Sequence, residues 1–269
     1  MIKLIASDID GTLLQNGETE ISPRFFREAS RLMDRGIALC AASGRQYKSL
    51  RGLFAPVADR MYFLCENGAV VYGPGEEPQL LSKTVIDRAL SLELCRDILD
   101  IPGCELLISG ANMSYLCPKT EDYLNHIRYF VGNNVTVLDS PLDMPEDFVK
   151  ISAFYLPGAE AVDAILTPRW AGRLGSAIAG KCWLDFTLAD KATGIRALCQ
   201  TLHIDAEDAM AFGDNYNDVP MLDAVGHPYL MRSAAAPLKA RYPIQCTRPE
   251  DVLETIQWKR ETNDAHIPF

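Results

Sequence analysis

The sequence lacks long hydrophobic runs and clusters of basic residues. Its first apolar stretch is short and ends at Asp8, and no run approaches the ~20 residues of a membrane-spanning helix. We therefore expect no signal peptide and no membrane partner. The 26 Lys and Arg residues are outnumbered by 36 Asp and Glu, which gives a formal net charge of −10. Because phosphate backbones are bound by clustered Lys and Arg, this balance argues against a nucleic-acid partner.

Cysteine and histidine show no pattern of metal ligation. The eight cysteines are scattered without C-x-x-C spacing, mostly among apolar neighbours as in ALCAAS and YFLCEN. Only four histidines are present, and they form no cluster. Scattered cysteines of this kind are typical of buried free thiols in a reducing compartment. We therefore expect a cytoplasmic protein without disulfides.

Both ends of the chain alternate between short apolar strands and amphipathic helices. Apolar runs at residues 2–5, 37–43 and 61–67 alternate with helical patterns at 21–36 and 46–54. The alternation resumes after residue 189, with a helical pattern followed by the apolar run DAMAFGD. Strands that are apolar throughout indicate a parallel sheet covered on both faces. The fold class expected is therefore α/β, with a Rossmann-like, doubly wound parallel core.

The middle of the chain follows another pattern. Here strands with alternating polarity, two of which flank the turn sequence GAN, mix with helical stretches. The helical stretches are Ile86–Leu99, Glu121–Val131 and Ala159–Leu166. This mixture predicts an inserted α+β module. The expected division is 1–81 and 189–269 for the two parts of the core, and 82–188 for the insertion.

Acidic and polar side chains follow the apolar strands of the core. Asp8 and Asp10 follow the first strand, Ser43 the second, and Asp214 and Asp218 the fourth. Because the carboxyl ends of parallel strands line one crevice, these side chains are expected to meet there. Four acids in one crevice repel each other unless a cation lies among them. Without histidine or thiolate, they favour a hard cation such as Mg²⁺, above all with a phosphorylated substrate.

Phosphoryl transfer is the chemistry that this set favours. Asp8 would attack phosphorus and form an aspartyl-phosphate, and Asp10 would protonate the leaving oxygen and then activate water. The hydroxyl of Ser43, the amide after it and the ammonium of Lys191 would hold the phosphoryl oxygens. Each segment alone is also typical of a capped turn or a loop. Their joint occurrence, each after an apolar strand, favours the catalytic interpretation.

Four segments, DIDGTLL, ASGR, DKATG and GDNYND, resemble the four motifs of the haloacid dehalogenase superfamily. CENGAVV is similar to the corresponding segment of its Cof-type, class IIB phosphatase branch. The resemblance covers essentially the whole chain. About 120 residues separate Asn67 from Lys191, which suits a small domain, and the resemblance implies a cap of the C2B type there. Such a cap would close over the crevice and choose the leaving group.

The resemblance also implies roles for individual residues. Asp8 would be the nucleophile and a Mg²⁺ ligand, and Asp10 the acid/base, which also ligates Mg²⁺ through its carbonyl. Asp214 would complete the metal site, and Asp218 would support it. The phosphate would be held by the residues Ile9 (through its amide), Ser43, Gly44, Lys191 and Asn217.

Other positions have more than one interpretation. Arg45 and Asn67 are candidates for the substrate rim, but Arg45 could pair with a nearby acid and Asn67 could only form a turn with Gly68. Arg232 and Ser233 stand where many relatives have Gly-Asn, and Arg232 could touch substrate or be a solvated charge. Tyr115, Lys119 and Lys150 are candidates for contacting the leaving group. As alternatives, Tyr115 could be a packing residue of a hairpin, and the two lysines could belong to a solvated face.

We therefore expect a Mg²⁺-dependent phosphatase acting on a small phosphorylated metabolite such as a sugar phosphate or pyridoxal phosphate. Two alternatives remain: a phosphomutase of the phosphomannomutase type, and a catalytically silent sensor of a phosphorylated ligand. A mutase would transfer phosphate without net release, and a sensor would bind without turnover. The oligomeric state is left open.

Overall fold

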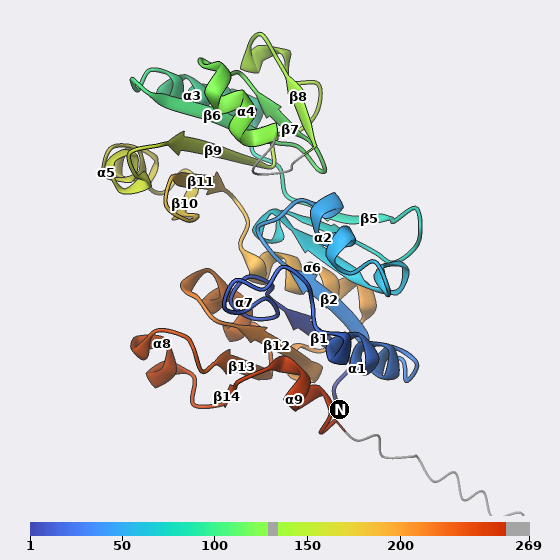
Figure 1. The fold of residues 1–269 in the computed structure, drawn as a ribbon. Helices are drawn as coiled ribbons and strands as arrows, with labels where there is room; N and C mark the ends of the chain where they lie inside the picture. The colour runs from blue at the N-terminus through green and yellow to red at the C-terminus, as the bar shows by residue number, and fades with distance from the viewer. Residues whose placement is uncertain (129–133, 257–269) are drawn as a thin grey trace, which may run out of the picture.

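Two β-sheets, each with its own helices, make up the structure (Figure 1). This computed structural model describes residues 1–128 and 134–256. Within this part of the chain, no helix has the length and apolar character that crossing a membrane requires. The sheet in the lower half of Figure 1 contains the N-terminal and C-terminal strands, and the one in the upper half contains the middle of the chain.

The first sheet has eight strands in the order β14-β13-β12-β1-β2-β3-β4-β5. Their bounds are β1 Leu4–Ser7, β2 Ala38–Ala42, β3 Tyr62–Cys65, β4 Val70–Tyr72, β5 Leu80–Lys83, β12 Ala209–Gly213, β13 His227–Met231 and β14 Gln245–Cys246. Strands β14 to β3 are parallel, and β4 and β5 extend the edge as antiparallel strands. The carboxyl ends of β1, β2 and β12 therefore lie next to one another.

Helices cover both faces of the first sheet, because alternate residues of its strands point to opposite faces. Ile5 of β1 packs in the cluster that includes buried residues of α1 (Pro23–Met33), α2 (Tyr47–Leu53) and α9 (Pro249–Leu253). Leu4 and Ala6 pack on the other side with residues of α6 (Lys191–Leu202), α7 (Val219–Asp223) and α8 (Ala236–Arg241). Two separate apolar cores thus hold β1 and its carboxyl end in place.

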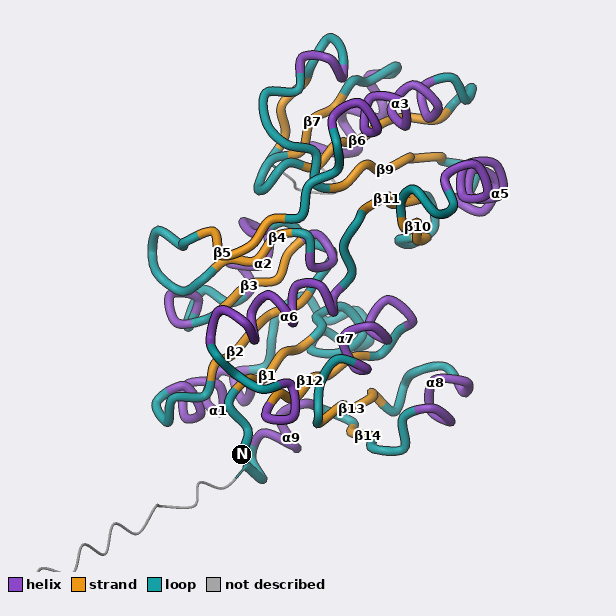
Figure 2. The backbone as a smooth tube through the Cα atoms, turned by 180° about the vertical axis from the view of Figure 1, so that it is seen from behind, coloured by secondary structure: helices purple, strands orange, loops and turns teal. Residues whose placement is uncertain are grey.

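The second sheet has six strands in the order β10-β11-β9-β6-β7-β8, all antiparallel except the pair β7 and β8. Their bounds are β6 Cys104–Ser109, β7 Ser114–Leu116, β8 Val135–Val137, β9 Lys150–Tyr155, β10 Gly175–Ile178 and β11 Trp183–Thr187. The helices are α3 Arg88–Leu99, α4 Glu121–His126 and α5 Ala159–Trp170. Figure 2 shows the same separation of the two sheets from behind.

The two faces of the second sheet differ in chemistry. Ile151 and Ala153 of β9 pack in an apolar cluster with buried residues of α3 and α5. On the opposite face of the strand, Lys150 and Ser152 line a cavity toward the first sheet. Farther along this face, Phe154 packs in a smaller apolar cluster with Leu107 and with Tyr123 of α4, so the polar part that borders the candidate site is the part around Lys150 and Ser152.

The expected fold class is confirmed: a parallel α/β core carries an antiparallel α+β insertion. Within the insertion, the first expected helix begins at Arg88 rather than Ile86, where Asp87 caps it by accepting from the amide of Leu90. The third helix continues past Leu166 to Trp170, whose buried ring anchors the last turn. Residues 129–131 of the second expected helix lie outside the described residues. The expected boundary between residues 81 and 82 falls within β5, and the division into domains stays a prediction.

Candidate active site

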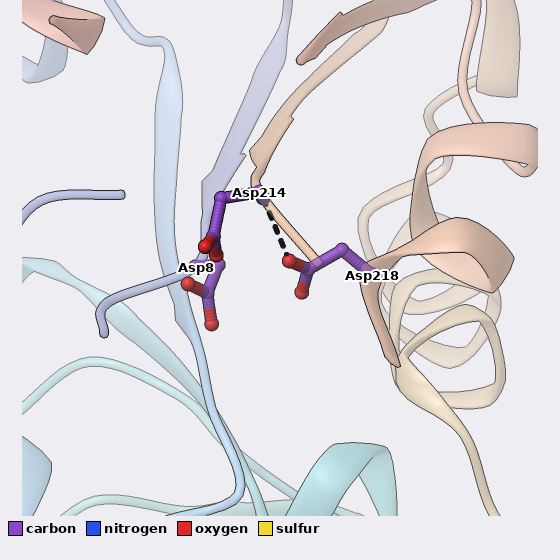
Figure 3. A group of neighbouring side chains, drawn as sticks. All are labelled: Asp8, Asp214 and Asp218. Carbon is purple, nitrogen blue, oxygen red and sulfur yellow. Dashed lines mark hydrogen bonds between the residues drawn. The ribbon is translucent and has the colours of Figure 1, made fainter. Parts of the chain in front are cut away.

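Three carboxylates converge at the carboxyl end of the first sheet (Figure 3). Asp8 directly follows β1, Asp214 follows the neighbouring strand β12, and Asp218 ends the short helix η6 (Tyr216–Asp218). One oxygen from each of the three lies within 4.8 Å of the others. Residues about 210 positions apart therefore meet because β1 and β12 are parallel neighbours, as the sequence predicts.

Lys191 lies between two of these acids. It is the first residue of α6, whose N-cap Asp190 accepts from the amide of Thr193 in a capping box. The Lys191 Nζ donates to Asp8 Oδ1 at 2.6 Å and to Asp218 Oδ1 at 2.5 Å, and its side chain is fully buried. The local helix start therefore fixes the ammonium group in the carboxylate cluster.

The oxygens of the three acids differ in how they are satisfied. Asp218 Oδ2 accepts from the backbone amides of Asp214, at 2.9 Å, and Asn215, at 3.1 Å, so both oxygens of Asp218 have partners. Asp8 Oδ2, by contrast, is buried and accepts no hydrogen bond. Asp214 Oδ1 has a long contact from the hydroxyl of Thr12, at 3.4 Å. Asp8 and Asp214 thus retain oxygens that could ligate a cation, whereas both oxygens of Asp218 already accept hydrogen bonds.

The electrostatics of the cluster favour an additional positive charge. Burial raises the pKa of Asp8, and burial followed by the charge of Asp218 raises the pKa of Asp214 to about 6. Burial opposes the charged form of Lys191, but the two carboxylates beside it raise its pKa overall. Three acids around a single ammonium group leave excess negative charge in a buried place, which a cation would neutralise.

Gly11 allows the chain to turn away from the cluster. Its φ of +96° is in the left-handed region, and a Cβ there would lie 2.2 Å from Asp214 Oδ2. A side chain at this position would therefore occupy the place of a site carboxylate. The Gly in DIDGT is explained by this close approach.

Of the residues expected to hold phosphate, Ser43, Gly44 and Asn217 line the cavity beside the cluster, whereas Ile9 and Lys191 are not among its lining residues. Ser43 directly follows β2 and is buried, whereas Asn217 is an exposed residue. Ile9 is buried beside Asp8. The backbone amide of Asn67 donates to the carbonyl of Ser43 at 3.0 Å, which ties the turn after β3 to the loop after β2.

Asp10 and Arg45 pair with each other at the cavity wall. The guanidinium group contacts both carboxylate oxygens, at 2.5 and 2.9 Å, and both side chains are substantially exposed. This is the pairing that the sequence left open as an alternative for Arg45. Arg232 and Ser233 are exposed and are not among the described residues that line the cavity.

The cavity has a volume of about 900 Å³ and is lined from both sheets. Of the three candidates for reading the leaving group, only Lys150 lines it; it is buried, so the solvated-face interpretation is wrong for this lysine. Tyr115 donates to Glu146 and Lys119 to the carbonyls of Leu99 and Ile101, away from the cavity. The cavity is also lined by residues that the sequence pattern did not predict, and the polar and aromatic ones among them include Gln46, Ser49, Glu66, Ser109, Ser152, Trp183, Asp185, Asn215 and Tyr216.

The geometry agrees with known proteins. The model of the haloacid dehalogenase-like hydrolase family matches residues 5–251. The chain is 28% identical over 270 residues to the 5-amino-6-(5-phospho-D-ribitylamino)uracil phosphatase YbjI of Escherichia coli, covering 95% of each chain.

Solved structures share the fold of this chain over most of its length. A crystal structure of a protein from Eubacterium rectale superposes with a TM-score of 0.85 at 28% identity, covering 94% of this chain and 98% of that one. The class IIB sugar phosphatase BT4131, at 20% identity and a TM-score of 0.74 over 93% of this chain and 95% of its own, shares the fold. The resemblance seen in the sequence is confirmed: this chain belongs to the haloacid dehalogenase-like hydrolase family.

Proposed function

We propose that this protein is a Mg²⁺-dependent phosphatase that hydrolyses small phosphomonoesters through an aspartyl-phosphate on Asp8. One observation carries the proposal: a buried nucleophile candidate lies in a carboxylate cluster that contains one ammonium group and excess negative charge. The printed activity of the Escherichia coli relative, a phosphatase of a small phosphorylated compound, supports the same class. The described part of the second sheet would form the cap over the site.

The residues present fit a hard divalent cation. Asp8 Oδ2 is buried without a partner, and Asp214 has no ion pair in the described part of the chain. Mg²⁺ prefers oxygen ligands, and it would be held by Asp8, the carbonyl of Asp10 and Asp214, while Asp218 orients Lys191 and the turn that carries Asp214. When bound, Mg²⁺ would neutralise negative charge on the phosphoryl oxygens.

The chain's own groups account for both half-reactions. An Asp8 oxygen attacks phosphorus, the bond to the leaving oxygen breaks, and Asp10 gives its proton to that oxygen. Asp10 then takes a proton from water, the water oxygen attacks phosphorus, and inorganic phosphate leaves Asp8. In this proposal Asp10 gives up its contact with Arg45 to reach the leaving oxygen. Ser43, the amide of Gly44 and Lys191 hold the phosphoryl oxygens throughout.

Phosphate release tests the proposal. Sugar phosphates, pyridoxal phosphate and p-nitrophenyl phosphate would be assayed with Mg²⁺, with chelator and with the Asp8→Asn variant. We expect release that depends on the metal and is lost in the variant. Transfer of phosphate between sugar hydroxyls without net release would replace the phosphatase by a mutase. Tight binding without turnover would replace it by a sensor.

A further inference from the structure

A second buried lysine faces the cavity from the opposite side. Lys150, the first residue of β9, is 8% exposed. Its Nζ lies 2.6 Å from Glu66 Oε2 and 3.3 Å from Asp185 Oδ2. Glu66 belongs to the turn η2 (Glu66–Gly68) of the first sheet, whereas Lys150 and Asp185 belong to the second. The contact of Lys150 with Glu66 therefore connects the two sheets, and its contact with Asp185 lies within the second.

Both carboxylates of this cluster are held firmly. Asp185 of β11 is the cross-strand neighbour of Ser152, whose hydroxyl donates to Asp185 Oδ1 at 2.6 Å. Glu66 and Asn67 are both in the left-handed region, with φ of +48° and +56°. The amide of Glu66 donates to the carbonyl of Arg45, and the amide of Asn67 donates to the carbonyl of Ser43. These hydrogen bonds hold the turn, whose backbone conformation is unfavourable for non-glycine residues, against the loop that follows β2. The cluster is thus built into the cavity wall.

Two further residues that line the cavity carry buried acceptor oxygens without a donor. Gln46 is 3% exposed and donates through Nε2 to Ser114 of the second sheet, and its Oε1 is buried without a donor. The Oδ1 of Asn67 is likewise buried and accepts no hydrogen bond. Buried acceptors without a donor are costly, but these two oxygens are closed to solvent, so they do not define the ligand that the cavity accepts.

The charged residues that line the cavity determine which substrates can bind beside this cluster. Among the described residues that line the cavity, the cations are Arg45 and Lys150. Arg45 is paired with Asp10, and Lys150 with two acids. A second anionic group on a substrate would therefore meet the carboxylates of Glu66 and Asp185 with no unpaired cation on this wall. Juxtaposed like charges in a partly desolvated place disfavour binding strongly.

We propose that Glu66 and Asp185, by holding Lys150, are specificity-determining residues that select phosphomonoesters whose leaving group is uncharged or cationic. They exclude leaving groups that carry a second anion, such as a carboxylate or another phosphate. This inference rests on the proposed phosphatase function and names the substrate class of the same cavity.

A pair of sugar phosphates tests the selection. Sorbitol 6-phosphate and 6-phosphogluconate are both open six-carbon chains, and they differ by a carboxylate in place of a hydroxymethyl group at the end remote from phosphate. Each is measured both as a substrate and as a competitor of p-nitrophenyl phosphate hydrolysis. We expect the wild-type protein to favour sorbitol 6-phosphate at least about tenfold in kcat/KM or in inhibition constant. In Asp185→Asn, which leaves Lys150 with one acid, this ratio falls at least about threefold.

Asp147→Asn is the matched control. Asp147 also pairs with a lysine, Lys83 at 2.6 Å, but it is exposed and lies outside the cavity lining, so its variant keeps the wild-type ratio. A wild-type ratio near one, with p-nitrophenyl phosphate hydrolysed, overturns the selection whatever the variants do. An unchanged ratio in a folded Asp185→Asn overturns the assignment to this carboxylate. Absence of any hydrolysis instead overturns the proposed function.

Discussion

Two buried lysines, each between two carboxylates, belong to clusters that border the cavity from opposite sides: Asp8 lines it for one cluster, and Lys150, Glu66 and Asp185 line it for the other. The two clusters differ in their balance of charge. On the side of the first sheet, Lys191 contacts Asp8 and Asp218 at 2.6 and 2.5 Å. On the side of the second sheet, Lys150 contacts Glu66 and Asp185 at 2.6 and 3.3 Å. We call these the floor cluster (Asp8, Lys191, Asp214, Asp218) and the roof cluster (Glu66, Lys150, Asp185).

The floor cluster has a third acid and a buried oxygen, Asp8 Oδ2, without a partner. In the roof cluster, Lys150 contacts both carboxylates and Ser152 donates to Asp185, although Glu66 Oε2 is also buried and accepts no hydrogen bond. The clusters therefore differ in charge: the floor has three carboxylates for one ammonium group, and the roof has two. The larger excess of buried negative charge suits the floor to bind a cation and to react, and the roof is suited to hold shape and charge. The same lysine–carboxylate arrangement can therefore serve chemistry on one side and selection on the other.

The largest expected effect comes from exchanging one acid in each cluster. Asp8→Asn removes the proposed nucleophile and should lower kcat for p-nitrophenyl phosphate by about 10³-fold or more. Asp185→Asn should leave that rate within about threefold, because this small aromatic ester places no second anion against the roof cluster. Initial rates on folded variants, checked by circular dichroism, measure both. Comparable losses of kcat in Asp8→Asn and Asp185→Asn would contradict the assignment of catalysis to the floor cluster and of selection to the roof cluster.

The two lysines give the next largest contrast. Lys191→Met and Lys150→Met each leave two buried carboxylates unpaired, and each should lower the free energy of unfolding by about 3–5 kcal/mol. Their kinetics should differ: Lys191→Met lowers kcat for every substrate by about 10²-fold, since it removes a phosphate ligand. Lys150→Met changes mainly KM, and mainly for sugar phosphates. A similar loss of kcat in both variants would contradict separate roles.

Metal binding offers an equilibrium test of the unmatched charge. Saturating Mg²⁺ should raise the Tm of the wild-type protein by about 5 °C, because a ligand present at about 100 times its Kd adds ~2.7 kcal/mol to stability. Asp214→Asn should lose most of this shift, and Asp185→Asn should keep it. Thermal melts with Mg²⁺ and with chelator provide the measurement. A shift that depends on Asp185 would place the cation in the roof cluster instead.

The floor cluster could be predicted from the sequence, and the roof cluster could not. Asp8 and Asp214 each follow an apolar strand, so the rule for parallel sheets brings them together without any knowledge of side chains. Lys191 follows from its place at a helix start. Asp185 and Lys150 lie on antiparallel strands, where their meeting depends on register and on the position of the inserted module over the core. Glu66 depends on a left-handed turn that its residue type does not favour.

The smallest expected effect tests whether floor and roof are independent. Gly194 of α6, three residues after Lys191, lies against the turn that carries Glu66: a Cβ there would be 2.3 Å from Leu64 Cδ1 and 3.0 Å from Gly68 Cα. Gly194→Ala should destabilise the fold by about 1–3 kcal/mol and, by separating helix from turn, lower both turnover and the preference for sorbitol 6-phosphate over 6-phosphogluconate.

Gly52→Ala in α2 is the control for this contact. A Cβ at Gly52 meets nothing within 4 Å, and Gly in a helix costs conformational entropy, so this variant should gain about 0.5–1 kcal/mol with unchanged kinetics. Chemical denaturation and the two-substrate assay together separate the outcomes. If Gly194→Ala loses stability but keeps both turnover and preference, the contact between α6 and the Glu66 turn only packs the core. If both kinetic quantities fall together, this contact couples the residues that react to the residues that select.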